Sequence, residues 1–343
     1  MKRFLTSVCV FFGIIAVSSV LISSLIFPRI KLYTKPFDGY VARCQSLTNL
    51  CDRPRLVLVG GSNLACGIDN LLLEKLLDDR YQLVNLGFHA GLGIGVHFDM
   101  IFDKLRSGDV VVLAAEYTNF GDRWSGGLPA VVFRCDVLGR NLFLSTLYDR
   151  WSSADCDLYR QYALEKFRKI TGGVQLFSAP IESQADKPKI ENADADIVED
   201  SSSPTAAYVK ASVWSASPYN ISQRSLRRLA LLANEFKDRG VTFLISASAF
   251  DERYYALHPE VDDFYKLFTK IPNLIVISSP RDYAFPLREM DNTKWHVNRI
   301  GREKRTRRLS EEILKALSIR TTCPSSKFFE AGASGGREVD PGM

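Results

Sequence analysis

The stretch that most constrains this chain is LVLVGGSNLACGID, residues 56–69. It opens with an apolar run of the length expected for a buried strand. Gly60 and Gly61 follow, and glycines allow the backbone to turn sharply. Ser62 comes next, ahead of a helix that we expect to be capped at residues 69–70. Two interpretations stay open from this stretch alone. Ser62 is a nucleophile presented at a strand end, or a serine that satisfies backbone groups in a turn.

The rest of the chain continues with alternating strands and helices. Further apolar runs predict strands at residues 81–86, 110–115, 241–246 and 274–278. Amphipathic spacing predicts helices at residues 70–77, 94–105, 223–238, 262–269 and 302–317. This order is typical of an α/β fold with a doubly wound sheet of five parallel strands. Ligands bind beyond the carboxyl ends of such strands, which is where Ser62 lies.

The amino-terminal segment predicts a membrane anchor. Residues 4–27 carry no charge, and a span requires ~20 apolar residues. The basic residues Lys2 and Arg3 precede the run, which favours a cytoplasmic start. We therefore expect residues 1–30 to be a single-pass transmembrane signal-anchor in the cell inner membrane, with the bulk of the chain extracytoplasmic (periplasmic). A cleaved signal peptide is the alternative.

Composition indicates how the residues after the amino-terminal segment are organised into regions. We expect a connector over residues 31–54 and one folded domain over residues 55–318, with an insertion at about 121–220 that interrupts the alternation and forms a cap. Within it, residues 178–206 are polar and acidic, which predicts disorder. The small, polar residues 319–343 predict a disordered tail.

Charge and cysteine content exclude some classes. The net charge is only +5, and much of the basic excess is gathered at Arg299, Arg302, Lys304, Arg305, Arg307 and Arg308. Glutamates interleave with this cluster, so we expect a solvated or membrane-facing helix face and no nucleic-acid partner. No cysteine or histidine spacing fits zinc, and we expect no metal and no cofactor. The pairs Cys44–Cys51 and Cys135–Cys156 are either disulfides or free thiols.

A serine nucleophile requires a base, an orienting group for that base, and donors aimed at the developing oxyanion. His296 is the candidate base because it lies in a loop after the last strand. Asp291 is the candidate orienting acid. Gly87 and Asn119 follow the second and third strands, so we expect them as oxyanion donors.

These segments together resemble the SGNH (GDSL-like) hydrolase superfamily. The resemblance rests on residues 60–63, 85–87, a polar end to strand three, and the His296 segment, 291–301, and it covers about residues 55–120 and 240–318. It implies a flavodoxin-like three-layer α/β/α sandwich with an acyl-ester hydrolysis or acyl-transfer site. By residue, it implies Ser62 as nucleophile, His296 as base, Asp291 as orienter, and Gly87 with the Ser62 N–H as oxyanion donors.

The chain departs from the superfamily pattern at three places. Gly61 stands where an aspartate usually precedes the serine, and Thr293 stands at the usual acid position. A Ser–His dyad is therefore an alternative to a triad with Asp291. Strand three ends directly in Glu116 and Tyr117 rather than in Gly-x-Asn. Either side chain is an alternative to Asn119 as occupant of the pocket.

The resemblance favours an extracytoplasmic serine esterase or O-acyltransferase that acts on acyl esters of a cell-surface glycan or polymer. The alternative is a non-catalytic scaffold partner of a membrane-bound O-acyltransferase. A dinucleotide site is disfavoured because Val96 occupies the place of the third glycine, and no P-loop is present. We expect His89 and His97 to be structural. The aromatic loop Tyr254, Tyr255 and His258 either lines an acceptor groove or packs in the core.

Overall fold

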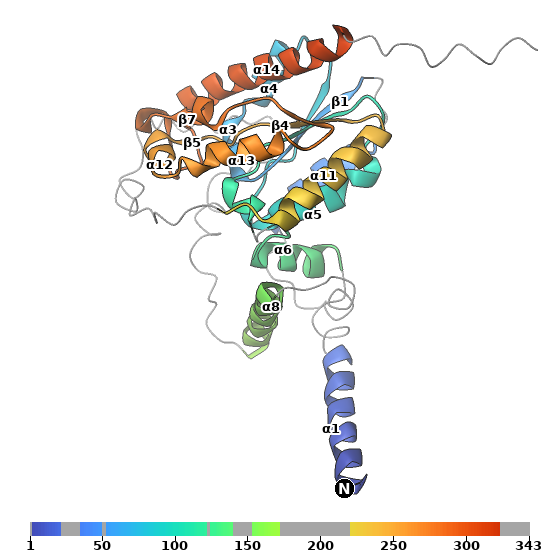
Figure 1. Ribbon diagram of the computed structural model, residues 1–343. Helices are drawn as coiled ribbons and strands as arrows, with labels where there is room; N and C mark the ends of the chain where they lie inside the picture. Colours follow the sequence, from blue (N-terminus) through green and yellow to red (C-terminus); the bar gives the residue numbers. More distant parts are fainter. Residues whose placement is uncertain are drawn as a thin grey trace, which may run out of the picture.

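The computed structural model describes residues 2–21, 35–49, 53–121, 124–139, 153–171 and 220–322 of the 343-residue chain. Its centre is a sheet of five parallel strands in the order β2-β1-β3-β4-β6 (Figure 1). The strands are β1 (Arg55–Val59), β2 (Gln82–Asn85), β3 (Val110–Leu113), β4 (Thr242–Ile245) and β6 (Leu274–Val276). The prediction of a five-stranded parallel sheet is confirmed, and the order is that of flavodoxin-like folds.

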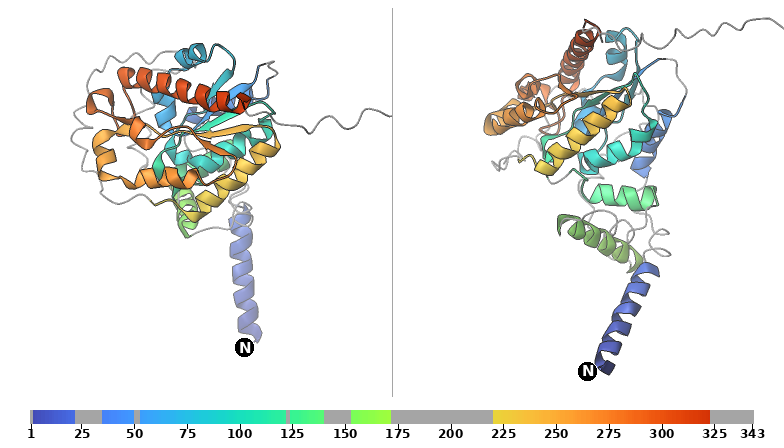
Figure 2. Two further views of the ribbon diagram at one scale, coloured as in Figure 1. Left: turned by 45° about the horizontal axis from the view of Figure 1, so that its top comes forward. Right: turned by 45° about the vertical axis from the view of Figure 1, so that its right-hand side comes forward.

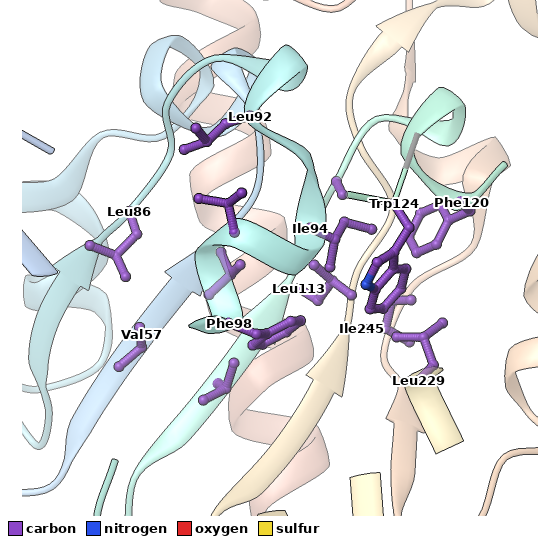
Figure 3. Packing of buried hydrophobic residues seen from close by; sticks show 14 of the residues in the cluster. Val57, Leu86, Leu92, Ile94, Phe98, Leu113, Phe120, Trp124, Leu229 and Ile245 are labelled. Carbon is purple, nitrogen blue, oxygen red and sulfur yellow. The ribbon is translucent and has the colours of Figure 1, made fainter. Parts of the chain in front are cut away.

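Helices cover both faces of the sheet. Successive strand residues point to opposite faces, so Leu56 and Leu58 join one hydrophobic cluster while Val57 and Val59 join the other. The first cluster is completed by α4 (Asn70–Leu76) and α14 (Arg299–Thr322), and the second by α5 (Gly93–Ile101) and α11 (Gln223–Asp238) (Figures 1 and 2). Figure 3 shows Phe98 and Leu229, which come from the second pair of helices, packed near Val57 and Ile245 of the sheet. Because β1 and β3 are buried along their whole length and helices lie on both faces, the sheet is the middle of three layers.

The other helices are α1 (Lys2–Leu21), α2 (Lys35–Ser46), α3 (Ser62–Gly67), α6 (Leu128–Val132), α8 (Ser153–Thr171), α12 (Glu252–Leu257) and α13 (Glu260–Phe268). Short turns of 3₁₀ helix are η3 (Ala90–Leu92), η4 (Phe102–Lys104), η5 (Tyr117–Phe120), η7 (Pro280–Tyr283) and η8 (Leu287–Glu289), and η6 (Phe133–Val137) is a π turn. A second parallel sheet pairs β5 (Phe250–Asp251) with β7 (Ala284–Phe285). The sequence pattern does not predict these two strands, since two residues are too few to show a period of two.

Across the described ranges, no helix combines the length and the apolar character that crossing a membrane requires. The anchor expected over residues 1–30 stays a prediction.

Helix α2 lies within the region expected as a connector, residues 31–54, and belongs to the core. Phe37, Tyr40 and Cys44 are buried, at spacings of three and four residues that place them on one helix face. The ring of Phe37 lies 5.2 Å from the ring of Phe133, and that of Tyr40 lies 5.7 Å from it. Proline and glycine in this segment favour a connector, but Pro36 lies in the first helical turn, where a proline costs no hydrogen bond.

The part of the insertion that is described forms a helical pair. Lys166 of α8 makes a buried ion pair with Asp136 of η6, and the hydroxyl of Tyr162 donates to the same carboxylate at 2.8 Å. The segments expected to be disordered lie outside the described residues, namely 178–206 and the tail beyond Thr322. Helix α14 continues past the predicted domain end at residue 318.

Two of the cysteines considered for disulfides are described. Cys44 and Cys135 are buried free thiols, which favours the free-thiol alternative for them. Cys51 and the side chain of Cys156 lie outside the described residues. Burial raises the pKa of the Cys44 thiol and raises that of Cys135 to about 12, which keeps both protonated at neutral pH.

His97 connects α5 to α2 and gives the fold an acid sensitivity. Its Nδ1 accepts a hydrogen bond of 2.8 Å from the Tyr40 hydroxyl. Burial, with a smaller contribution from the Arg43 charge, lowers the pKa of His97 to about 3. The unfolded chain binds a proton at this position below its ordinary pKa of 6.5, whereas the folded chain does not. Stability is therefore lost as the pH falls from 6.5 towards 3.

We predict that His97→Gln, which keeps an acceptor but cannot titrate, weakens this dependence. Between pH 7.5 and pH 5 the wild type should lose about 2 kcal/mol more free energy of unfolding than the variant, from ~1.36 kcal/mol per pKa unit over about 1.5 units. Urea unfolding at both pH values measures the difference. Equal losses in the two proteins would contradict the assignment.

Candidate functional site

The first part of the site is built by the end of β1. All residues of β1 are buried, Gly60 and Gly61 follow, and Ser62 is the first residue of the short helix α3. The Ser62 side chain is partly exposed at this point, whereas its neighbour Asn63 is fully buried. The turn thus delivers one hydroxyl to the carboxyl edge of the sheet, as the sequence predicts.

His296 meets this hydroxyl from the far end of the chain. Its Nε2 lies 2.9 Å from Ser62 Oγ, although the two residues are 234 positions apart. His296 is buried, with 3% exposure, and lies in the loop that precedes α14. The structure therefore brings together the two residues that the sequence analysis names as candidate nucleophile and candidate base, within the reach that proton transfer requires.

The partner on the other side of the imidazole is Asn292. Its Oδ1 lies 2.8 Å from His296 Nδ1. The sequence analysis names Asp291 as the orienting acid, and that role of Asp291 stays a prediction. The backbone N–H of Asp291 donates to the His296 carbonyl at 2.8 Å and closes a tight turn. The turn brings Asn292, four residues before His296, to the imidazole ring. The signal for Asn292 in the sequence is only that a second polar residue follows Asp291 directly.

This arrangement selects one tautomer of His296. An amide oxygen accepts, so Nδ1 carries the proton and Nε2 is left to accept from the Ser62 hydroxyl. A neutral amide supplies this orientation without the negative charge that an aspartate would add. It therefore stabilises the imidazolium less than a carboxylate does.

Glu116 lies beneath the nucleophile turn. Its Oε1 accepts a hydrogen bond of 3.2 Å from the Asn63 N–H, and the side chain is 1% exposed. Burial raises the pKa of this carboxyl, while hydrogen bonds from Asn63 and the Arg305 charge act in the opposite direction. A Cβ on Gly61 would stand 2.1 Å from Glu116 Oε2. The space that a side chain at position 61 would need is thus filled by the carboxylate of Glu116, which follows β3.

The candidate oxyanion donors already have partners inside the protein. The Gly87 N–H donates to Asn85 Oδ1 at 2.8 Å, and Asn119 Nδ2 donates to the Ala90 carbonyl at 2.8 Å. The Ser62 N–H is at the first position of α3, where a helical N–H has no partner within the helix. The role of all three groups as oxyanion donors stays a prediction.

Aromatic rings pack behind His296. The ring of Trp295 lies 5.8 Å from Tyr117, 6.1 Å from Phe250 and 6.0 Å from Tyr254. Tyr254 and His258 are almost completely buried, so of the two interpretations of this aromatic loop, packing describes them. The Lys294 ammonium lies 3.8 Å from the Tyr254 ring centroid, at the exposed side of this wall.

The histidines outside the site have structural contacts. His89 Nδ1 accepts from the Gly91 N–H at 2.9 Å, and His97 accepts from Tyr40. Among the residues that the structure describes, no three His, Cys, Asp or Glu side chains gather as a metal site would require.

Comparisons with known proteins add little to this geometry. No family model matches the chain, and no curated protein matches it. One solved structure, described as "The structure of a putative platelet activating factor from Streptococcus pneumonia", aligns over 82% of this chain and 93% of its own, with 10% identity and a TM-score of 0.40.

We predict that Gly61→Ala destabilises the protein through Glu116. The added methyl group must displace a buried carboxylate, and such overpacking costs about 1–3 kcal/mol. In a Glu116→Ala background the same change should cost much less, because the space is then empty. Urea unfolding of both single variants and the double variant gives the coupling. Additive effects would show that the two residues do not compete for this space.

Proposed function

We propose that this protein is a serine hydrolase of the SGNH type that acts on acyl esters. The observation that carries the proposal is the hydrogen bond between Ser62 Oγ and His296 Nε2, 2.9 Å long. A serine hydroxyl becomes nucleophilic when a base within this distance can take its proton. Asn292, on the opposite side of the ring, holds the base in the competent tautomer.

The reaction divides between these groups. Ser62 Oγ attacks the acyl carbon while His296 Nε2 accepts the hydroxyl proton. The oxyanion that forms is stabilised by the Ser62 N–H, with Gly87 as second donor once its N–H turns from Asn85. The carbonyl re-forms, the ester C–O bond breaks, and the alcohol leaves with the proton from His296. Water, activated by the same nitrogen, then releases the acid from Ser62. If an acceptor hydroxyl takes the place of water, the result is acyl transfer.

We also propose a cellular location and a substrate class for this activity. The apolar amino terminus and the resemblance to the superfamily support an extracytoplasmic enzyme held at the inner membrane. Its substrate would be an acyl ester of a cell-surface glycan or polymer. Transfer rather than hydrolysis would apply if it works beside a membrane-bound O-acyltransferase.

A non-catalytic scaffold for such an acyltransferase is the second candidate. Two features favour it. The Gly87 and Asn119 donors are both engaged within the protein, and the group on His296 is a neutral amide. A scaffold would retain the fold without an activated serine.

The two candidates differ in the reactivity of Ser62 towards a fluorophosphonate. In the purified full chain, an activated Ser62 displaces fluoride from phosphorus and becomes covalently labelled. We predict stoichiometric labelling of Ser62, its loss in Ser62→Ala, and a rate at least about 100-fold lower in His296→Ala, the size expected for loss of a general base. Ser107→Ala, an exposed serine in the turn before β3, is the matched control and should label normally.

Peptide mass spectrometry locates the label, and circular dichroism checks that the variants fold. A folded wild type that resists the probe would overturn the esterase proposal and favour the scaffold.

A further inference from the structure

We propose that Glu116, Asn63 and Arg305 form a positioning network that holds Ser62 Oγ in line with His296 Nε2. None of the three touches a reacting atom in the mechanism above. The inference rests on the proposed function in one respect, since it concerns the same serine and histidine. Its test, however, measures their alignment and does not require native activity.

Asn63 is the centre of the network. It follows Ser62 directly and is fully buried. Its N–H donates to Glu116 Oε1 at 3.2 Å, and its side-chain Nδ2 donates to the Ala114 carbonyl, at the end of β3, at 3.1 Å. Both of its oxygens, Oδ1 at 2.7 Å and the backbone carbonyl, accept from Arg305. Every polar group of the residue beside the nucleophile is thereby used.

Arg305 reaches Asn63 from α14. It belongs to the basic cluster that the sequence assigns to a solvated face, yet it is 1% exposed. A Cβ added to Gly67 would stand 2.3 Å from Nη1 of this guanidinium. Arg305 therefore fills the space that a side chain at the last residue of α3 would need. The planar fork of a guanidinium donates to two oxygens at once, which a lysine ammonium does not reproduce in this geometry.

The position of Arg305 in the chain explains why it aligns the site. Helix α14 begins at Arg299, directly after the loop that carries His296. The helix that Ser62 begins has only six residues and no side-chain cap at Gly61. The nucleophile turn thus has little rigidity of its own. A hydrogen-bonded bridge from α14 fixes this turn to the segment that carries the base.

Buried opposite charges strengthen the bridge. Burial lowers the pKa of Arg305 to about 10, so it remains a cation at neutral pH. The nearby cation counters the burial that raises the pKa of Glu116. The Glu116 carboxylate accepts from the Asn63 N–H, and the Arg305 guanidinium donates to the Asn63 carbonyl. Each charge therefore faces the end of a peptide dipole that has the opposite partial charge. Hydrogen bonds to charged groups are about twice as strong as neutral ones.

The test replaces the nucleophile by a thiol and reads its ionisation. In Ser62→Cys, a thiol aligned with His296 should have a lowered pKa and react rapidly with iodoacetamide at pH 7. Peptide mass spectrometry separates this site from the native cysteines. Adding Arg305→Met, Arg305→Lys or Glu116→Ala should slow alkylation at pH 7 at least about tenfold. All the rates should converge above pH 10, where every thiol is ionised.

Two further variants separate positioning from general destabilisation. Glu116→Gln keeps an oxygen acceptor for the Asn63 N–H and should remain within about twofold of the parent. Arg307→Met removes an exposed arginine of α14, paired with Glu303, and should have no effect. Thermal melts confirm folding, and Arg305→Lys retains the buried charge if Arg305→Met does not fold.

The proposal is overturned if folded Arg305→Lys and Glu116→Ala alkylate within about twofold of the parent at pH 7. It is also overturned if the thiol of the parent Ser62→Cys reacts as an ordinary thiol. If the wild type resists the fluorophosphonate while the thiol is activated in a network-dependent way, the hydrolase proposal fails and the network stands.

Discussion

The hydrogen bond between Ser62 and His296 joins two segments 234 residues apart, and much of the fold serves to make that distance reproducible. A parallel sheet brings the carboxyl ends of its strands to one edge. Ser62 lies at that edge because it follows β1, and the loop after η8 places His296 beside it. The two helices that follow these residues, α3 and α14, are then connected through Asn63 and Arg305. Alignment of the pair is thus a property of buried polar contacts as well as of strand order.

The electrostatics of the site differ from those of a serine triad with an aspartate. The imidazole is oriented by a neutral amide, and the carboxylate near the nucleophile, Glu116, bonds to a backbone N–H instead of to the histidine. The imidazolium that forms during attack is therefore less stabilised. Such a site suits an ester, whose alkoxide leaves more readily than an amine. It also suits a protein whose reactivity is completed by a partner that contributes further donors.

Sequence reasoning identified the five strands of the central sheet and named Ser62 and His296 as candidates, because each depends on local pattern: apolar runs of strand length, glycines at a turn, and a histidine in a late loop. It did not identify Asn292. The turn at residues 291–296 decides which of two adjacent polar side chains reaches the imidazole, and the hydrogen bonds of that turn leave no spacing pattern in the sequence. It placed Arg305 on an exposed face because neighbouring charges made that face look solvated. It missed the core role of α2 because a proline and a glycine hide the spacing of Phe37, Tyr40 and Cys44. The errors over Arg305 and α2 share one cause, namely contacts between segments distant in sequence.

The central claim, that Asn292 holds His296 ready to accept the Ser62 proton, is tested most directly by the protonation pattern of the His296 ring. Nitrogen-15 NMR of histidine-labelled full chain reports it, and only four histidines must be assigned, with His296→Ala identifying the signal. Our account predicts a neutral ring at pH 8 with the proton on Nδ1, and loss of that preference in Asn292→Ala. A ring protonated on Nε2 in the wild type would contradict it, because that nitrogen could then take no proton from Ser62.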